Sequence, residues 1–204
     1  RLAQWVRSTA RKLRLGAILS LHAASTLYGN TDKHYHGYTR AYDFLLKRMR
    51  LKRLLIWEIG VGGYGDPRSG GGSLRIWRDT FPRSQIIGID IEPKLISLGR
   101  RVHVITADQS KHQDLLGVID HFGIPDLIID DGSHRGSDIW FTFRTVWPLM
   151  REGGVYIVED LHTSFWPKYG GDPVEPPTES GLGLARNLVV SVQLQDRIFE
   201  RSSL

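Results

Sequence analysis

The sequence contains no cysteine and no long apolar run. The absence of cysteine from all 204 residues excludes disulfide bonds, thiol catalysis and zinc sites built on cysteine. No apolar stretch approaches the ~18 residues of a membrane span, so no transmembrane segment is expected. The first residues also lack the order of a secretory signal. We therefore expect a protein of the reducing cytoplasm.

Acidic residues are missing from the first 31 positions, and this explains the basicity of the whole chain. The sequence has 27 Lys and Arg against 22 Asp and Glu, a formal net charge of +5. Residues 1–31 hold five of the basic side chains and no acid, which leaves the remainder neutral. Enzymes that act on nucleic acids carry a basic stripe at their site, so we expect no nucleic-acid partner. Residues 2–21 have apolar side chains near helical spacing and are interpreted as a helix packed on the domain.

Short apolar runs alternate with helical patterns from residue 54 onward. Strands are predicted at residues 54–59, 86–89, 102–106, 126–129 and 155–158, and helices at 73–81, from 93, at 111–122 and at 138–150. Such alternation is typical of an α/β fold with a mostly parallel sheet and helices on both faces. We predict one Rossmann-like domain with an N-terminal helical extension. Weaker strand patterns occur at 188–194 and 198–199.

Two adjacent acidic pairs follow predicted strands: Asp130 with Asp131, and Glu159 with Asp160. Ligands of open α/β sheets bind beyond the carboxyl ends of the strands, so neighbouring strands would bring four carboxylates to one edge. Such charge requires shifted pKa values or a cation. Oxygen ligands suit a hard divalent ion, Mg²⁺ or Mn²⁺. His134 follows in the turn after the first pair and is a candidate for catalysis.

The glycine-rich loop after the first strand differs from a dinucleotide fingerprint. Gly60, Gly62 and Gly65 spell G-x-G-x-x-G, but a second glycine run at 70–72 comes before the predicted helix. In the dinucleotide motif the helix opens within the fingerprint, where it meets a pyrophosphate. Glu58 instead gives the pattern Glu-x-Gly-x-Gly, which resembles motif I of class I S-adenosylmethionine methyltransferases. Glycines there would permit close backbone approach to a cofactor that has no phosphate.

Further acids stand at the ends of the second and third strands. Asp90 is placed where a carboxylate can accept both ribose hydroxyls, and Asp108 with Gln109 where the adenine amino group would lie. Together with Glu58 they favour a methyltransferase over an NAD-binding protein. Ser73 and Asp130 complete the set of candidate cofactor-binding residues.

Several segments closely resemble the macrolide deoxysugar O-methyltransferases of the mycinamicin and macrocin type. The resemblance is carried by residues 57–64, 71–77, 126–134 and 158–164, with residues 28–33 and 37–39 similar to the motif before their catalytic domain. It implies a Rossmann-like class I methyltransferase fold. Residues 1–37 would form the helical extension with a cofactor-site motif, and residues 38–204 the methyltransferase domain. The mycobacterial 1-O-methyltransferases of methylmannose polysaccharide synthesis, a smaller type, also fit the length.

The resemblance further implies a reaction and a set of roles. Members of this family are magnesium-dependent and transfer a methyl group from S-adenosylmethionine to a sugar hydroxyl. Carried over by motif, Asp131, Glu159 and Asp160 would be metal ligands and His134 the general base. A sugar or glycoside acceptor and assembly into a homo-oligomer are implied as well. The alternatives are O-methylation of a diol or catechol-like molecule, an RNA methyltransferase, and a Rossmann-like binding protein without turnover.

Overall fold

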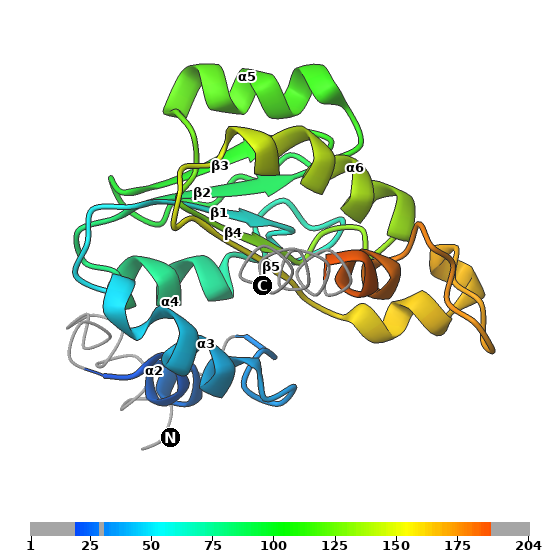
Figure 1. Ribbon diagram of the computed structural model, residues 1–204. Coiled ribbons are helices and arrows are strands. Elements are labelled where there is room, and N and C mark those ends of the chain that lie inside the picture. The colour runs from blue at the N-terminus through cyan, green and yellow to red at the C-terminus, as the bar shows by residue number, and fades with distance from the viewer. Residues whose placement is uncertain (1–18, 29–30, 189–204) are drawn as a thin grey trace, which may run out of the picture.

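Five parallel strands form the centre of the computed structural model, which describes residues 19–28 and 31–188 (Figure 1). The strands are β1 (Leu55–Ile59), β2 (Gln85–Asp90), β3 (Val102–Thr106), β4 (Leu127–Asp130) and β5 (Val155–Val158). Their order is β3-β2-β1-β4-β5, with every neighbouring pair parallel. All carboxyl ends therefore lie at one edge, and β1, β4 and β5 are adjacent there.

Helices cover both faces of the sheet. On one face lie α4 (Gly72–Thr80), α3 (Tyr38–Leu46) and α2 (Leu21–Tyr28), and on the other α5 (His112–Phe122) and α6 (Gly136–Val146) (Figure 1). Short 3-10 helices are η2 (Lys47–Met49), η3 (Trp147–Leu149), η4 (Leu161–Phe165) and η5 (Pro167–Tyr169), and residues 181–188 are helical. This arrangement is the predicted α/β architecture.

Strict alternation along the strands divides the core into two layers. Ile56 and Leu127 pack in the core cluster that contains α2, α3 and α4, whereas Trp57 and Ile128 pack toward α5 and α6. All four side chains are fully buried. Because successive strand residues point to opposite faces, the same alternation also decides where the acids at the strand ends point.

The five predicted strands are present with ends shifted by at most one residue, but the helix predicted from residue 93 is wrong. No helix occurs between β2 and β3; residues 94–99 run without regular structure. Ile96 and Leu98 pack against the core, two positions apart, which is the spacing of an extended chain rather than of a helix. The Leu95 N–H donates to the Pro67 carbonyl at 2.6 Å, which holds this extended course.

The terminal predictions fall mostly beyond the described residues. Residues 2–18 of the predicted N-terminal helix and residues 189–199 of the weaker strand patterns lie outside them, and Leu188 is helical. Among the described residues, no helix has the length and apolarity needed to cross a membrane.

Truncation of Ile56 in the central strand should cost much stability. Ile56 is 0% exposed, and Ile→Ala in a packed core typically costs about 2–5 kcal/mol because a cavity remains. Ile56→Ala should therefore lower the free energy of unfolding in urea by an amount in that range. Leu45→Ala, at a side chain that is 56% exposed, is the control. Equal effects of the two substitutions would contradict this packing.

Candidate active site

A cavity of about 740 Å³ opens at the carboxyl edge of the sheet. Pockets that bind small molecules and cofactors are typically ~300–1,000 Å³, so its size suits a cofactor. Nine of the twelve predicted site residues line it: Gly60, Gly62, Ser73, Asp90, Asp108, Gln109, Asp131, His134 and Asp160. Glu58, Asp130 and Glu159 do not line it and are buried behind its wall.

The backbone at Gly60 touches the loop that follows β4. A Cβ built on Gly60 would lie 2.0 Å from the carbonyl oxygen of Asp131, and its φ is +89°. Any side chain there would meet both a clash and an unfavourable backbone conformation. The Gly60 N–H donates to Ile89 across the sheet at 2.8 Å. This glycine therefore lets the loops after β1 and β4 lie together as one wall of the cavity.

Asp90 and Asp108 line the cavity from the ends of β2 and β3. Asp90 accepts the N–H of Val61 at 2.9 Å through Oδ2 and that of Glu92 at 2.9 Å through Oδ1. Hydrogen bonds from the Ser110 side chain and backbone lower the pKa of Asp108. Asp90 thus holds the glycine loop in place, and Asp108 presents an ionised carboxylate.

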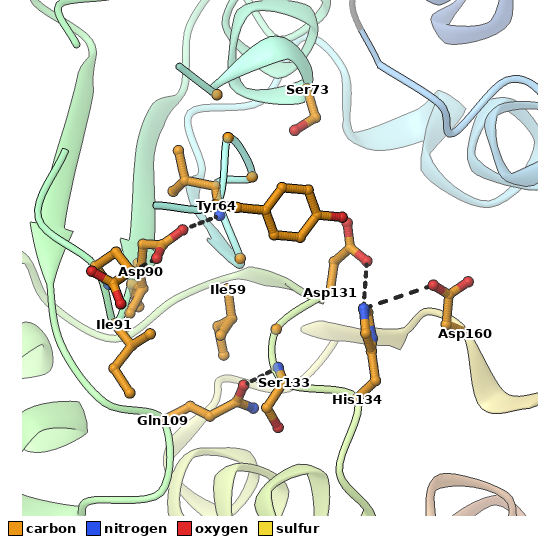
Figure 2. Close-up of a pocket in the computed structure, with 18 of the residues that line it drawn as sticks. Ile59, Tyr64, Ser73, Asp90, Ile91, Gln109, Asp131, Ser133, His134 and Asp160 are labelled. Atoms are coloured by element: carbon orange, nitrogen blue, oxygen red, sulfur yellow. Dashed lines mark hydrogen bonds and ion pairs between the residues drawn. The ribbon is translucent and has the colours of Figure 1, made fainter. Parts of the chain in front are cut away.

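Gln109 joins the end of β3 to the loop that carries His134. Its Nε2 donates to Asp130 Oδ1 at 3.1 Å. Its Oε1 accepts the Ser133 N–H at 2.8 Å (Figure 2). A Cβ on Gly132 would lie 2.0 Å from the same Oε1. Because its amide is engaged in these bonds, Gln109 fixes the geometry of the loop as well as lining the cavity.

The two residues of the first acidic pair point to opposite faces of the sheet. Asp130 lies two positions after Ile128 and therefore has the same parity along the strand, which means that it points to the same face. It lies on the α6 side and accepts the Tyr156 hydroxyl at 2.9 Å. Burial raises the pKa of Asp130 to about 6. Asp131 has the parity of Ile129 and points toward the α2–α4 side. The strand ends of β4 and β5 therefore do meet, but the alternation removes Asp130 from the expected group of four carboxylates.

Lys33 lies among three carboxylates on the α2–α4 side. Its Nζ is 2.6 Å from Asp131 Oδ2, 2.6 Å from Glu159 Oε1 and 3.2 Å from Glu58 Oε1, and the residue is only 4% exposed. Burial alone lowers the pKa of the Lys33 ammonium, but these carboxylates more than offset burial and raise it. Lys33 was not among the site residues predicted from the sequence. The predicted cluster of carboxylates requires a cation, and Lys33 is the basic residue of the segment 28–33, which resembles the family motif.

Two tyrosines of α3 bind the second acidic pair. The Tyr42 hydroxyl donates to Glu159 Oε1, and the Tyr38 hydroxyl donates to Asp160 Oδ1 at 2.6 Å. Burial, together with the hydrogen bond to Asp160, raises the pKa of Tyr38 to about 12. Burial likewise raises the pKa of Glu159, although Lys33 works against this shift. Burial also raises the pKa of Tyr42, so both tyrosines remain protonated donors at neutral pH.

His134 stands between two carboxylates at the cavity wall. Its Nε2 is 3.9 Å from Asp131 Oδ1 and 3.8 Å from Asp160 Oδ2 (Figure 2). One donor atom from each of the three residues lies within 4.8 Å of the others. His134 and Asp160 have positive φ, +58° and +55°, a conformation that costs roughly 1–3 kcal/mol for such residues and recurs at functional sites. Two carboxylates at this spacing suit a divalent ion, and the His134 imidazole lies beside them.

An arc of aromatic rings continues from His134 along η4 and η5. The ring of Tyr169 is 6.0 Å from that of His134, and Trp166 is 6.0 Å from Tyr169 and 4.8 Å from His162. Trp166 is 49% exposed. These rings offer apolar surface close to the acidic group.

Comparison with known proteins identifies relatives of this chain. No protein-family model matches it. It is 40% identical over 162 residues to 8-demethyl-8-alpha-L-rhamnosyl tetracenomycin-C 2'-O-methyltransferase of Streptomyces olivaceus, covering 79% of this chain and 43% of that protein. It is also 40% identical over 163 residues to mycinamicin VI 2''-O-methyltransferase of Micromonospora griseorubida, covering 79% and 41%.

A solved structure shares the fold. The MycE methyltransferase from the mycinamycin biosynthetic pathway, in complex with Mg and SAH, matches with a TM-score of 0.80 and 37% identity over 87% of this chain and 46% of that one. The predicted Rossmann-like class I methyltransferase fold and the resemblance to macrolide sugar O-methyltransferases are thereby confirmed. The chain spans about half the length of the relatives it matches.

Substitution of Gly60 should destabilise the site far more than substitution of Gly65 in the same loop. A Cβ at Gly60 would clash with Asp131 at 2.0 Å, whereas one at Gly65 meets nothing within 4 Å. Gly60→Ala should therefore lower the midpoint of thermal unfolding clearly, while Gly65→Ala leaves it nearly unchanged. Similar midpoints for the two variants would show that the loops after β1 and β4 do not lie this close.

Proposed function

We propose that this chain, which shares sequence and fold with sugar O-methyltransferases, transfers a methyl group from S-adenosylmethionine to a sugar hydroxyl with the help of Mg²⁺ or Mn²⁺. The observation that carries the proposal is the position of His134 between Asp131 and Asp160 at the wall of a cofactor-sized cavity. Relatives named as sugar O-methyltransferases and a structural neighbour bound to Mg and SAH support it.

The cofactor would bind in the cavity along the carboxyl ends of β1, β2 and β3. The bare backbone of Gly60 and Gly62 would allow close approach, and Asp90 would accept hydrogen bonds from the ribose hydroxyls. Asp108, Gln109 and Ser73 would complete the wall, since all three line the cavity. Glu58 and Asp130 would act from behind it, through the Ser73 hydroxyl at 2.7 Å and through Gln109.

The divalent ion would be held by Asp131, Glu159 and Asp160. Oxygen donors of this kind fit Mg²⁺. Asp131 and Asp160 line the cavity, while Glu159, whose Oε1 is bound by Lys33 and Tyr42, would contribute its other oxygen. When bound, such an ion stabilises negative charge on an acceptor oxygen and orients the acceptor.

His134 would be the general base. Histidine is the side chain best suited to exchange a proton near neutral pH. The sugar hydroxyl would give its proton to Nε2 as its oxygen attacks the methyl carbon, and the carbon–sulfur bond breaks to leave neutral S-adenosylhomocysteine. The flanking carboxylates of Asp131 and Asp160 stabilise the imidazolium that forms. Positioning of the two reactants supplies much of the remaining rate enhancement.

The acceptor would lie between the cavity and the aromatic arc of Tyr169, Trp166 and His162. Sugars present C–H faces that pack on aromatic rings while their hydroxyls reach polar groups. A catechol-like or other diol acceptor would use the same ion and base, so it remains the alternative, and homo-oligomer assembly remains a prediction.

Replacement of His134 should strongly lower turnover but not cofactor binding. General-base catalysis typically contributes about 10²–10⁴-fold, so His134→Ala should lower kcat for methyl transfer by a factor in that range. Titration calorimetry with S-adenosylhomocysteine should give a wild-type Kd. The control is His112→Ala, an exposed histidine at the start of α5. Wild-type turnover in His134→Ala would refute the assignment.

Removal and restoration of the divalent ion tests whether methyl transfer depends on it. Wild-type protein treated with EDTA should lose methyl transfer to a panel of glycosides and regain it on addition of Mg²⁺. Transfer to catechols but to no glycoside would favour the alternative acceptor. Failure to bind S-adenosylhomocysteine with or without Mg²⁺ would refute the methyltransferase proposal itself.

A further inference from the structure

A short segment, residues 31–42, reaches across the carboxyl ends of β1, β4 and β5. It includes the start of α3 and supplies three hydrogen-bond donors to the carboxylates there: Lys33, Tyr38 and Tyr42. The predicted boundary between residues 37 and 38 falls within this segment. Through these three donors, the segment contacts the candidate site directly.

Lys33 controls the orientation of Asp131. The ammonium holds Oδ2 at 2.6 Å, while Oδ1 is the oxygen that faces His134 at 3.9 Å. The same ammonium binds Glu159 Oε1 at 2.6 Å. One buried cation thus fixes two of the three carboxylates assigned to the divalent ion, each through a single oxygen.

The tyrosines complete this set of contacts. The Tyr42 hydroxyl donates to Glu159 on the same oxygen that Lys33 binds. The Tyr38 hydroxyl donates to Asp160 Oδ1 and accepts the Asp160 backbone N–H at 3.3 Å, while Oδ2 of that residue faces His134 at 3.8 Å. In Asp131 and in Asp160 alike, one carboxylate oxygen is tied to residues 31–42 and the other points toward the base.

A metal site requires surrounding groups that fix one oxygen of a carboxylate ligand and leave the other oxygen accessible. Groups that hydrogen-bond to metal ligands fix their orientation, and their loss typically costs 10–100-fold in metal affinity or activity. Lys33 also neutralises part of a buried negative charge that would otherwise drive the carboxylates apart. Because the donors lie 98 to 126 residues before the ligands in sequence, folding of the N-terminal segment onto the sheet assembles the site.

We propose that Lys33, Tyr38 and Tyr42 are positioning residues that hold Asp131, Glu159 and Asp160 in the arrangement that binds the divalent ion. The inference rests on the proposed function, since it concerns the same ion. It adds that the N-terminal segment, and not the sheet alone, sets the affinity of the chain for that ion. Lys33 also lines the cofactor cavity, whereas Tyr38 and Tyr42 do not.

The test is calorimetric titration of Mg²⁺ into the full chain saturated with S-adenosylhomocysteine. Tyr38→Phe and Tyr42→Phe remove one hydroxyl each, and Lys33→Met removes the charge at similar length. Each should raise the Kd for Mg²⁺ by about 10–100-fold. The two tyrosine variants, whose residues do not line the cofactor cavity, should leave the Kd for S-adenosylhomocysteine within about twofold. Such a split is not produced by a general loss of packing.

Tyr28→Phe is the matched control. Tyr28 is 1% exposed on α2, and its hydroxyl donates to the buried carboxylate of Asp79 at 3.0 Å. Its loss should lower the thermal midpoint and leave the Kd for Mg²⁺ unchanged. If Lys33→Met fails to fold, the two tyrosine variants decide.

The outcomes separate the inference from the function. Folded Tyr38→Phe and Tyr42→Phe variants that bind Mg²⁺ as the wild type does would overturn the inference and leave the proposed function standing. An equal loss of Mg²⁺ affinity in Tyr28→Phe would also overturn it. Wild-type protein that binds S-adenosylhomocysteine but no Mg²⁺ would overturn the metal mechanism and the inference together.

Discussion

The site depends on the alternation of side chains at the ends of three adjacent strands. Glu58, Asp131 and Glu159 share the parity that points toward α2, α3 and α4, and all three meet the ammonium of Lys33 there. Asp130 has the opposite parity and is bound by Gln109 and Tyr156 beneath α6. A shift of one residue in the pairing of β4 with β1 would exchange these two environments, so the sheet register sets the chemistry of the cavity.

This arrangement buries carboxylates that need partners, and this need explains why residues 31–42 lie against strand ends that are distant in sequence. A carboxylate without a partner in a protein interior is strongly unfavourable, and loss of one partner from a buried ion pair typically costs about 3–5 kcal/mol. Lys33 and the hydroxyls of Tyr38 and Tyr42 meet this requirement from one short segment. The same contacts leave one oxygen each of Asp131 and Asp160 facing His134.

The sequence predicted those features that depend on local pattern. The apolar runs placed the strands, and the acids at their ends placed the cavity, because parallel strands end at one edge. Local pattern was insufficient where packing decided: Ile96 and Leu98 lie in an extended segment that was predicted to begin a helix. The role of Lys33 was missed since its partner Asp131 is 98 positions away, a contact that only the folded chain reveals.

The most direct test of this account is the position of a divalent ion in crystals grown with Mn²⁺ and S-adenosylhomocysteine. Anomalous scattering should show one manganese peak at the cavity wall, coordinated by Asp131, Glu159 and Asp160 beside His134, with Lys33 still bound to Asp131 and Glu159. A peak at the position of the Lys33 ammonium, or no peak at saturating Mn²⁺, would contradict the proposal that the Lys33 ammonium and one divalent ion bind these carboxylates together.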